Sequence, residues 1–175
     1  VGIYAHNRVE WLEALLACWK IRAVAVNINF RYVEPELEYL WQDADLVALV
    51  YECGFAPRVA ELASRFALLR TYLYLEDPAA TDNESTPPGV GYEYALAGQP
   101  GARGFAPRSA DDLYLVYTGG TTGMPKGVLW RHEDFYHNVI CLNQATSSPE
   151  SILQHADNPN AMRTMMLSPL MHGGG

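Results

Sequence analysis

The sequence predicts an α/β fold in which a parallel β-sheet is flanked by helices. The order of apolar segments along the sequence supports this prediction. Short apolar runs, rich in β-branched and aromatic residues, alternate with longer segments whose apolar residues recur at helical spacing. The alternation begins at the first residue and continues to about residue 75. Strands that alternate with helices in this way pair in parallel, because each helix carries the chain back along the sheet.

The first half of the chain contains four predicted strands and three predicted helices. Asn7, followed three residues later by Glu10, matches a capping box at the start of the first helix. Pro35 is compatible with the first turn of the second helix. The predicted strands span 1–4, 23–28, 46–51 and 71–75, and the predicted helices span 7–19, 35–41 and 56–66.

Residues 76–110 interrupt this alternation. The stretch holds five of the eleven prolines and an acidic run around Asp82 and Glu84. We interpret it as a mobile surface connection between two subdomains. The chain 1–175 is thus divided into a βα subdomain at 1–75, a linker at 76–110 and a phosphate-loop segment at 111–175.

The segment 111–175 opens with a predicted strand at 113–117, and a second strand follows at 128–130. These two stiff elements bracket a flexible, glycine-rich loop. A helix is predicted from Asp134 onward. A polar stretch at 147–160 and a last strand at 164–167 complete the predicted order.

The loop between these strands, residues 117–127, has the composition of a polyphosphate-binding site. Glycines let the backbone approach a ligand closely and let successive N–H groups point into one concavity. Threonine hydroxyls add donors or magnesium ligands, and lysine is a compact charge on a long stem that suits phosphate oxygens. Pro125 stiffens the exit from the loop. The candidate phosphate-binding residues are Thr118, Gly119, Gly120, Thr121, Thr122, Gly123 and Lys126.

The loop differs from the two common nucleotide-binding patterns. A Walker loop has glycine directly before the lysine and serine or threonine after it, whereas Pro125 precedes Lys126 here and Gly127 follows it. The dinucleotide pattern G-x-G-x-x-G is also absent from the sequence. The alternative at this point is a glycine-rich hairpin that binds no ligand.

Residues 117–127 resemble the phosphate loop of adenylate-forming enzymes, whose usual form is Y-T-S-G-T-T-G-x-P-K-G. This superfamily includes acyl-CoA synthetases, luciferases and the adenylation domains of peptide synthetases. Gly119 replaces the usual serine, which removes one hydroxyl donor and keeps the backbone N–H. The resemblance extends less specifically to residues 1–11 and 27–37, for which we favour a role in maintaining the fold.

A second stretch resembles the same superfamily. The pattern P-L-x-H-x-x-G is matched by Pro169, Leu170, His172 and Gly175. The resemblance implies that His172 lies at the junction of the acyl and nucleotide sites, contacts the substrate carboxylate region and helps to shape the thiol tunnel. Ser168 lies in the same loop without a clear acid partner, so a hydrolase triad is not supported.

The resemblance implies a ligase. The parent protein is expected to activate a small-molecule carboxylate with ATP and Mg²⁺ to an acyl adenylate, and then to transfer the acyl group to a thiol. We favour coenzyme A as the source of this thiol, and a carrier protein is the alternative. Lys126 and His172 are the implied catalytic residues, and Thr118 is the implied magnesium ligand. The loop would stabilise the negative charge of the departing pyrophosphate.

The residues after the loop indicate which group of the superfamily the chain resembles. Residues 130–134 look like a set of actinobacterial acyl-CoA ligases that act on fatty acids or sterol side chains. Within this stretch, we interpret Arg131 and His132 as structural or solvated rather than catalytic. The acidic pair Asp111 and Asp112 invites a metal-binding interpretation, but a charged entry to the strand at 113–117 is favoured.

Composition excludes several classes of function. A net charge of −8 argues against nucleic acid as a partner. No apolar run approaches the roughly 18 residues that a membrane span needs. The three cysteines lack metal-binding spacing, which indicates buried free thiols in a cytoplasmic protein.

We interpret the chain as an internal fragment, because it begins inside a strand and stops in a glycine run. The resemblance places it in the large N-terminal domain of an adenylate-forming enzyme, whose adenine, ribose and metal motifs and C-terminal lysine come later. The fragment alone is therefore expected to be inactive without the remainder of its own chain. The alternatives are a non-catalytic truncated relative and a simple polyphosphate-binding α/β module. The oligomeric state, a homo-oligomer included, is left open.

Overall fold

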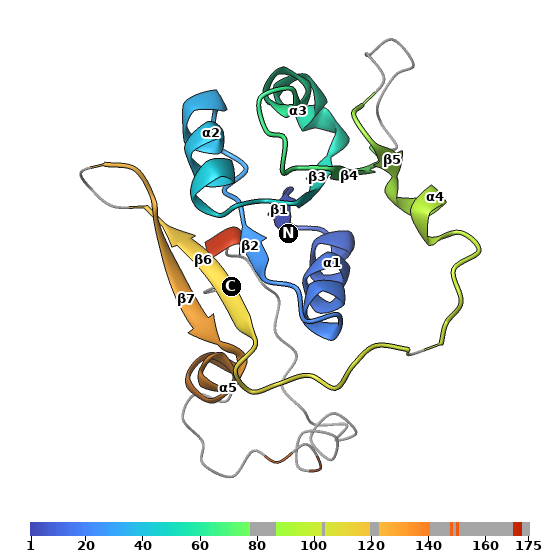
Figure 1. The fold of residues 1–175 in the computed structure, drawn as a ribbon, viewed down its shortest axis with the longest axis vertical. Helices are drawn as coiled ribbons and strands as arrows, with labels where there is room; N and C mark the ends of the chain where they lie inside the picture. The colour runs from blue at the N-terminus through green and yellow to red at the C-terminus, as the bar shows by residue number, and fades with distance from the viewer. Residues whose placement is uncertain are drawn as a thin grey trace.

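A computed structural model describes residues 1–77, 87–102, 104–119, 123–140, 148, 150 and 170–172. They form one sheet with the strand order β5-β4-β3-β1-β2-β6-β7 (Figure 1). Neighbouring strands pair in parallel, except that β6 and β7 are antiparallel. The strands are β1 (Gly2–Tyr4), β2 (Ala25–Asn27), β3 (Ala48–Glu52), β4 (Thr71–Leu75), β5 (Val90–Gly91), β6 (Leu113–Thr118) and β7 (Lys126–Arg131).

Helices flank this sheet, so the predicted α/β fold with a mainly parallel sheet is confirmed. The antiparallel pair has a simple cause. The connection 119–125 is too short for the crossover of about a dozen residues that a parallel pair needs. The helices are α1 (Val9–Lys20), α2 (Glu34–Asp43), α3 (Ala56–Ala63), α4 (Tyr92–Leu96) and α5 (His132–Phe135), which continues into the π-helix η2 (Tyr136–Ile140); the 3₁₀ turns are η1 (Cys53–Phe55) and η3 (Leu170–His172).

The two faces of the sheet carry separate apolar cores. Successive strand residues point to opposite faces, so Tyr4 packs into one core and Ile3 into the other. The helices α2 and α3 cover the first face, where Leu40 and Trp41 are fully buried. The helix α1 covers the second face, together with residues of α4 and η3. Figure 1 shows α2 and α3 on one side of the strands and α1 on the other.

The start of α1 differs from the predicted capping box. The N-cap residue is Arg8, and no side chain caps the helix. Asn7 is not the cap, because its Oδ1 atom accepts a hydrogen bond from the backbone N–H of Leu170 at 2.8 Å. Glu10 instead forms an ion pair with Arg8 at 2.8 Å, and Arg8 also donates to the Glu76 carbonyl at the end of β4.

The Arg8–Glu10 pair predicts a dependence of stability on pH. The Arg8 guanidinium lowers the pKa of Glu10 to about 2, from an ordinary value of 4.5. The pair therefore stabilises the fold fully above pH 4.5, and this contribution is lost as the pH falls towards about 2. We expect Glu10→Gln to lower the free energy of unfolding at neutral pH and to match the wild type near pH 2. Urea unfolding across that range measures the difference, and a gap that widens on acidification would contradict the assignment.

Residues 76–110 contain more regular structure than predicted. Strand β5 extends the sheet beside β4, and helix α4 follows it directly. The turn before β5 depends on Gly89, which has a φ of +101° and lies so close to Tyr72 that a Cβ atom would meet its carbonyl oxygen. Residues 90–96 thus hold a strand and a helix that the sequence did not predict. The proposed division into subdomains stays a prediction.

The remaining elements agree with the sequence where they are described. Strands β6 and β7 lie at the predicted positions, and helix α5 begins two residues before the expected Asp134. The predicted strand at 164–167 and nearly all of the polar stretch at 147–160 lie outside the described residues. Cys18 is buried, which raises the pKa of its thiol. Among the described helices, none combines the length and the apolar character that crossing a bilayer requires.

Candidate functional site

The candidate phosphate loop connects β6 to β7. The two strands pair in register from Leu113 and Arg131 to Thr118 and Lys126, so the loop begins where this ladder ends. It therefore leaves the carboxyl end of β6, on the same edge of the sheet as the ends of β1 and β2. Open α/β sheets bind their ligands outside this edge.

The base of the loop is fixed by packing and by one hydrogen bond. Tyr117 is buried, and its hydroxyl donates to Asp43 Oδ2 at the end of α2, at 2.6 Å. Burial and the Asp43 carboxylate both raise the pKa of Tyr117, so the phenol stays neutral. Pro125 is buried at the other side of the base. The two strands thus present the loop from a rigid support.

The described part of the loop is open and exposes a cation. Gly123 has a φ of +144°, which side chains other than glycine rarely adopt, and nothing lies within 4 Å of the position of a Cβ atom there. At Gly119 too, nothing lies within 4 Å of the position of a Cβ atom. Thr118 and Lys126 are exposed, and the Thr118 hydroxyl makes a long contact of 3.5 Å with the Lys126 carbonyl. Gly120, Thr121 and Thr122 lie outside the described residues.

These features fit a polyphosphate ligand. Within the described ranges, no carboxylate forms an ion pair with the Lys126 ammonium, so its charge is available to an anion. No group of three or more His, Cys, Asp or Glu side chains that could hold a metal occurs among them either. Thr118 stays the candidate magnesium ligand of this chain as a prediction, and its exposed hydroxyl oxygen is of the type that magnesium binds.

The segment that carries His172 packs beside the same strands. Turn η3 contacts β2 and β6, and Leu170 and Met171 are both buried. The Leu170 carbonyl accepts a hydrogen bond from Asn27 Nδ2 at 3.3 Å. The structure thus brings the backbone of His172 next to the strand that leads into the phosphate loop. The imidazole lies outside the described side chains, so its place at the junction of the acyl and nucleotide sites stays a prediction.

The charged residues that flank the β6–β7 hairpin have structural partners. Arg131 forms an ion pair with Asp111 at 2.7 Å, and Asp112 forms one with Arg22 at 2.9 Å. The Ser109 backbone N–H, with a contribution from Arg22, lowers the pKa of Asp112. The His132 ring packs against Trp19 at 5.1 Å between centroids, and burial lowers the pKa of His132. The structural interpretation of these residues agrees with their contacts.

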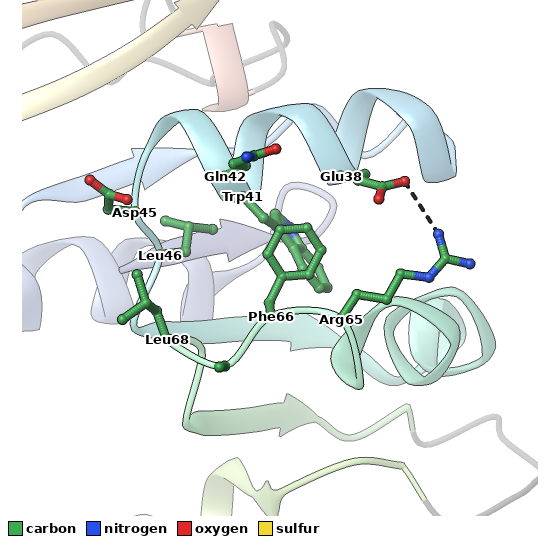
Figure 2. A pocket seen from close by; sticks show the side chains of 9 residues that line it. Glu38, Trp41, Gln42, Asp45, Leu46, Arg65, Phe66 and Leu68 are labelled. Atoms are coloured by element: carbon green, nitrogen blue, oxygen red, sulfur yellow. Dashed lines mark hydrogen bonds and ion pairs between the residues drawn. The ribbon is translucent and has the colours of Figure 1, made fainter.

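A cavity of about 290 Å³ lies away from this edge. Figure 2 shows it between α2 and the turn that precedes β4, where the Trp41 and Phe66 rings meet edge to face. Glu38 and Arg65 form an ion pair at its rim, and Asp45 adds a second carboxylate. The lining residues precede β3 and β4, so the cavity belongs to the amino end of the sheet and is separate from the candidate site.

Sequence reasoning missed two polar pairs at the carboxyl edge. Asn27 is buried at the end of β2, and Asn7 follows β1; both contact Leu170. His6 Nδ1 lies 2.8 Å from Glu52 Oε2, which joins the ends of β1 and β3. For Asn27, the available signal was a polar residue at the end of a buried strand. Nothing in the sequence indicated the His6–Glu52 pair.

The relatives of this chain are ligases that form coenzyme A thioesters. A 3-oxocholest-4-en-26-oate–CoA ligase of Rhodococcus rhodochrous is 41% identical over 180 residues, which cover 99% of this chain and 32% of the relative. A medium/long-chain-fatty-acid–CoA/3-oxocholest-4-en-26-oate–CoA ligase of Mycobacterium tuberculosis is 49% identical over 180 residues, with the same two coverages. The chain thus spans about a third of the length of these curated relatives.

Solved structures agree with the fold. The anthranilate CoA ligase AuaEII in complex with anthranoyl-AMP superposes with a TM-score of 0.69 at 24% identity, over 79% of this chain and 26% of that chain. The N-terminal domain of FACL13 from Mycobacterium tuberculosis gives a TM-score of 0.61 at 25% identity, over 84% of this chain and 34% of that chain. The family model described as AMP-binding enzyme matches residues 1–175. The chain therefore belongs to the AMP-binding enzyme family.

Proposed function

We propose that the protein containing this chain is an ATP-dependent acyl-CoA ligase. The observation that carries the proposal is the exposed ammonium of Lys126 beside the open space at Gly119 and Gly123, in a chain whose relatives are CoA ligases. The full reaction has two steps. A carboxylate oxygen attacks the α-phosphorus of ATP and pyrophosphate leaves; a thiolate then attacks the acyl carbon and AMP leaves.

The residues of this chain would act in the first step. As the bond to pyrophosphate breaks, negative charge grows on the leaving oxygens. Lys126 and the backbone N–H groups of Gly119 and Gly123 would stabilise that charge from fixed positions. The Thr118 hydroxyl would bind a phosphate oxygen or Mg²⁺, which supplies further charge neutralisation. Gly120, Thr121 and Thr122 complete the proposed loop, and His172 would adjoin the carboxylate.

The relatives suggest the substrate and the acceptor. Their names include medium- and long-chain fatty acids and a sterol side-chain acid, each joined to coenzyme A. A feruloyl-CoA synthase of Amycolatopsis is less similar, at 32% identity over 173 residues. We therefore propose an aliphatic or sterol side-chain acid as the substrate, coenzyme A as the thiol and the cytoplasm as the location.

Acid-dependent exchange of pyrophosphate into ATP tests the proposal in the full-length protein. We expect exchange with fatty acids or 3-oxocholest-4-en-26-oate, weaker exchange with ferulate, and a CoA thioester by mass spectrometry once coenzyme A is added. Nucleotide binding without exchange for any acid would contradict the proposal and would favour a simple polyphosphate-binding module. Residues 1–175 alone are expected to give no measurable exchange.

A further inference from the structure

Both polar backbone groups of Leu170 are held by asparagine side chains. The Leu170 N–H donates to Asn7 Oδ1 at 2.8 Å, and the Leu170 carbonyl accepts from Asn27 Nδ2 at 3.3 Å. The asparagines follow or end two neighbouring parallel strands, β1 and β2. One asparagine supplies an acceptor and the other supplies a donor, and both bind the backbone of the same residue of η3, as a neighbouring strand would. We call these two hydrogen bonds the Leu170 clamp.

The environment of Asn27 fixes the direction of its amide. Asn27 is only 1% exposed, and its Nδ2 group donates one hydrogen to the Leu170 carbonyl and the other to the Tyr114 hydroxyl. A backbone carbonyl can only accept, so the amide must present its NH₂ group to Leu170. Burial raises the pKa of Tyr114 to about 12, so this partner is neutral at physiological pH.

Packing alone would leave the turn less precisely placed. Leu170 is buried in the second core, which keeps η3 on the sheet, and Met171 is buried as well. Apolar burial is non-directional, however, and would tolerate small rotations of a turn this short. Two hydrogen bonds, one from the last residue of β2 and one from the bend after β1, remove that freedom. A misplacement of about 1 Å in a catalytic group can reduce the rate about a hundredfold.

We propose that Asn7 and Asn27 are positioning residues, which hold the backbone of Leu170 and thereby set the place of His172 relative to the phosphate loop. The inference rests on the proposed function, because it gives η3 a part in the reaction. It assigns both asparagines a role beyond the maintenance of the fold.

The Asn7 variants separate positioning from folding, because Asn7 is exposed and its substitution leaves no buried cavity. In the full-length protein, Asn7→Ala removes the acceptor, whereas Asn7→Asp keeps an oxygen facing the Leu170 N–H. We expect Asn7→Ala to reduce kcat for thioester formation at least tenfold, with KM for ATP within twofold of the wild type. Asn7→Asp is expected to retain at least half of kcat.

Asn27 gives the reciprocal test. Asn27→Asp replaces the donor by an acceptor that faces the Leu170 carbonyl. We therefore expect Asn27→Asp to reduce kcat, whereas Asn7→Asp retains it. Asn138→Ala is the matched control, because Asn138 is exposed and its amide donates to the Asp134 carbonyl within its own helical segment, at 2.8 Å. We expect Asn138→Ala to leave kcat unchanged within twofold.

Hydrogen exchange of the 170–172 amides provides a readout that does not depend on activity. Faster exchange in Asn7→Ala and wild-type exchange in Asn7→Asp are expected if the clamp holds the turn. An active wild type with unchanged kcat in Asn7→Ala would overturn the positioning role while leaving the ligase assignment intact. An inactive wild type would instead remove the proposed function, and the exchange rates alone would then decide whether the asparagines hold η3.

Discussion

Lys126→Ala in the full-length protein is expected to reduce the rate of adenylate formation about a hundredfold or more, which corresponds to a few kcal/mol of barrier. Lys126 is exposed at the start of β7 and forms no ion pair within the described ranges, so its removal leaves no described buried partner unsatisfied. The free energy of unfolding should therefore change by about 0.5 kcal/mol or less. Pyrophosphate exchange and thermal melting, measured on the same preparation, test both parts.

The chain offers a matched control for this variant. Lys20 and Lys126 are the two lysines of the sequence, and Lys20 is exposed at the end of α1, away from the loop. Lys20→Ala should leave the exchange rate unchanged. Lys126→Arg keeps the charge with a planar group and is expected to fall between the wild type and Lys126→Ala. Normal exchange by Lys126→Ala, or a collapse of its melting temperature, would refute the assignment.

Leu40→Ala is expected to destabilise the fold by about 2–5 kcal/mol. Leu40 is 0% exposed in α2 and belongs to the core between α2, α3 and the sheet. Its truncation leaves a cavity that the surrounding Trp41, Leu37 and Val59 side chains fill only in part, because each of them is already packed. Urea unfolding of the full-length protein measures the change, with activity per folded molecule preserved.

The same position supplies the control for that experiment. Leu40→Met conserves the volume of the side chain and is expected to cost less than about 1.5 kcal/mol. A difference between the two variants isolates the cavity from any general effect of substitution in α2. Equal destabilisation by Ala and Met would show that volume is not what Leu40 contributes, and no destabilisation by Ala would contradict its place in the core.

Most elements could be predicted because their signals are local. The apolar residues of α2 recur every three or four positions, and Thr71–Leu75 was predicted with its observed bounds. The phosphate loop was equally visible, since its glycines, threonines and lysine are contiguous in sequence. Strand β5 was missed because it has two residues, and a pairing that short leaves no periodic pattern.

Asn7 shows where local reasoning fails. Its side-chain oxygen could accept a hydrogen bond from a helix N–H two or three residues away, as the capping pattern predicts. The structure gives it the Leu170 N–H instead, which lies 163 residues away in sequence. Either N–H group would satisfy the side-chain oxygen of Asn7, so the local sequence does not indicate which of the two it binds.

The sequence alone determined the order of strands and helices over residues 1–75, the family resemblance and the candidate phosphate loop, because each depends on neighbouring residues. The tertiary structure decided that β1 lies between β2 and β3, that β6 joins β2, and that two asparagines meet at Leu170. Those outcomes depend on which distant groups packing brings within hydrogen-bonding reach. A hydrogen bond forms only when its donor and acceptor atoms lie about 3 Å apart. Residues that are distant in sequence therefore become partners only once the chain has folded.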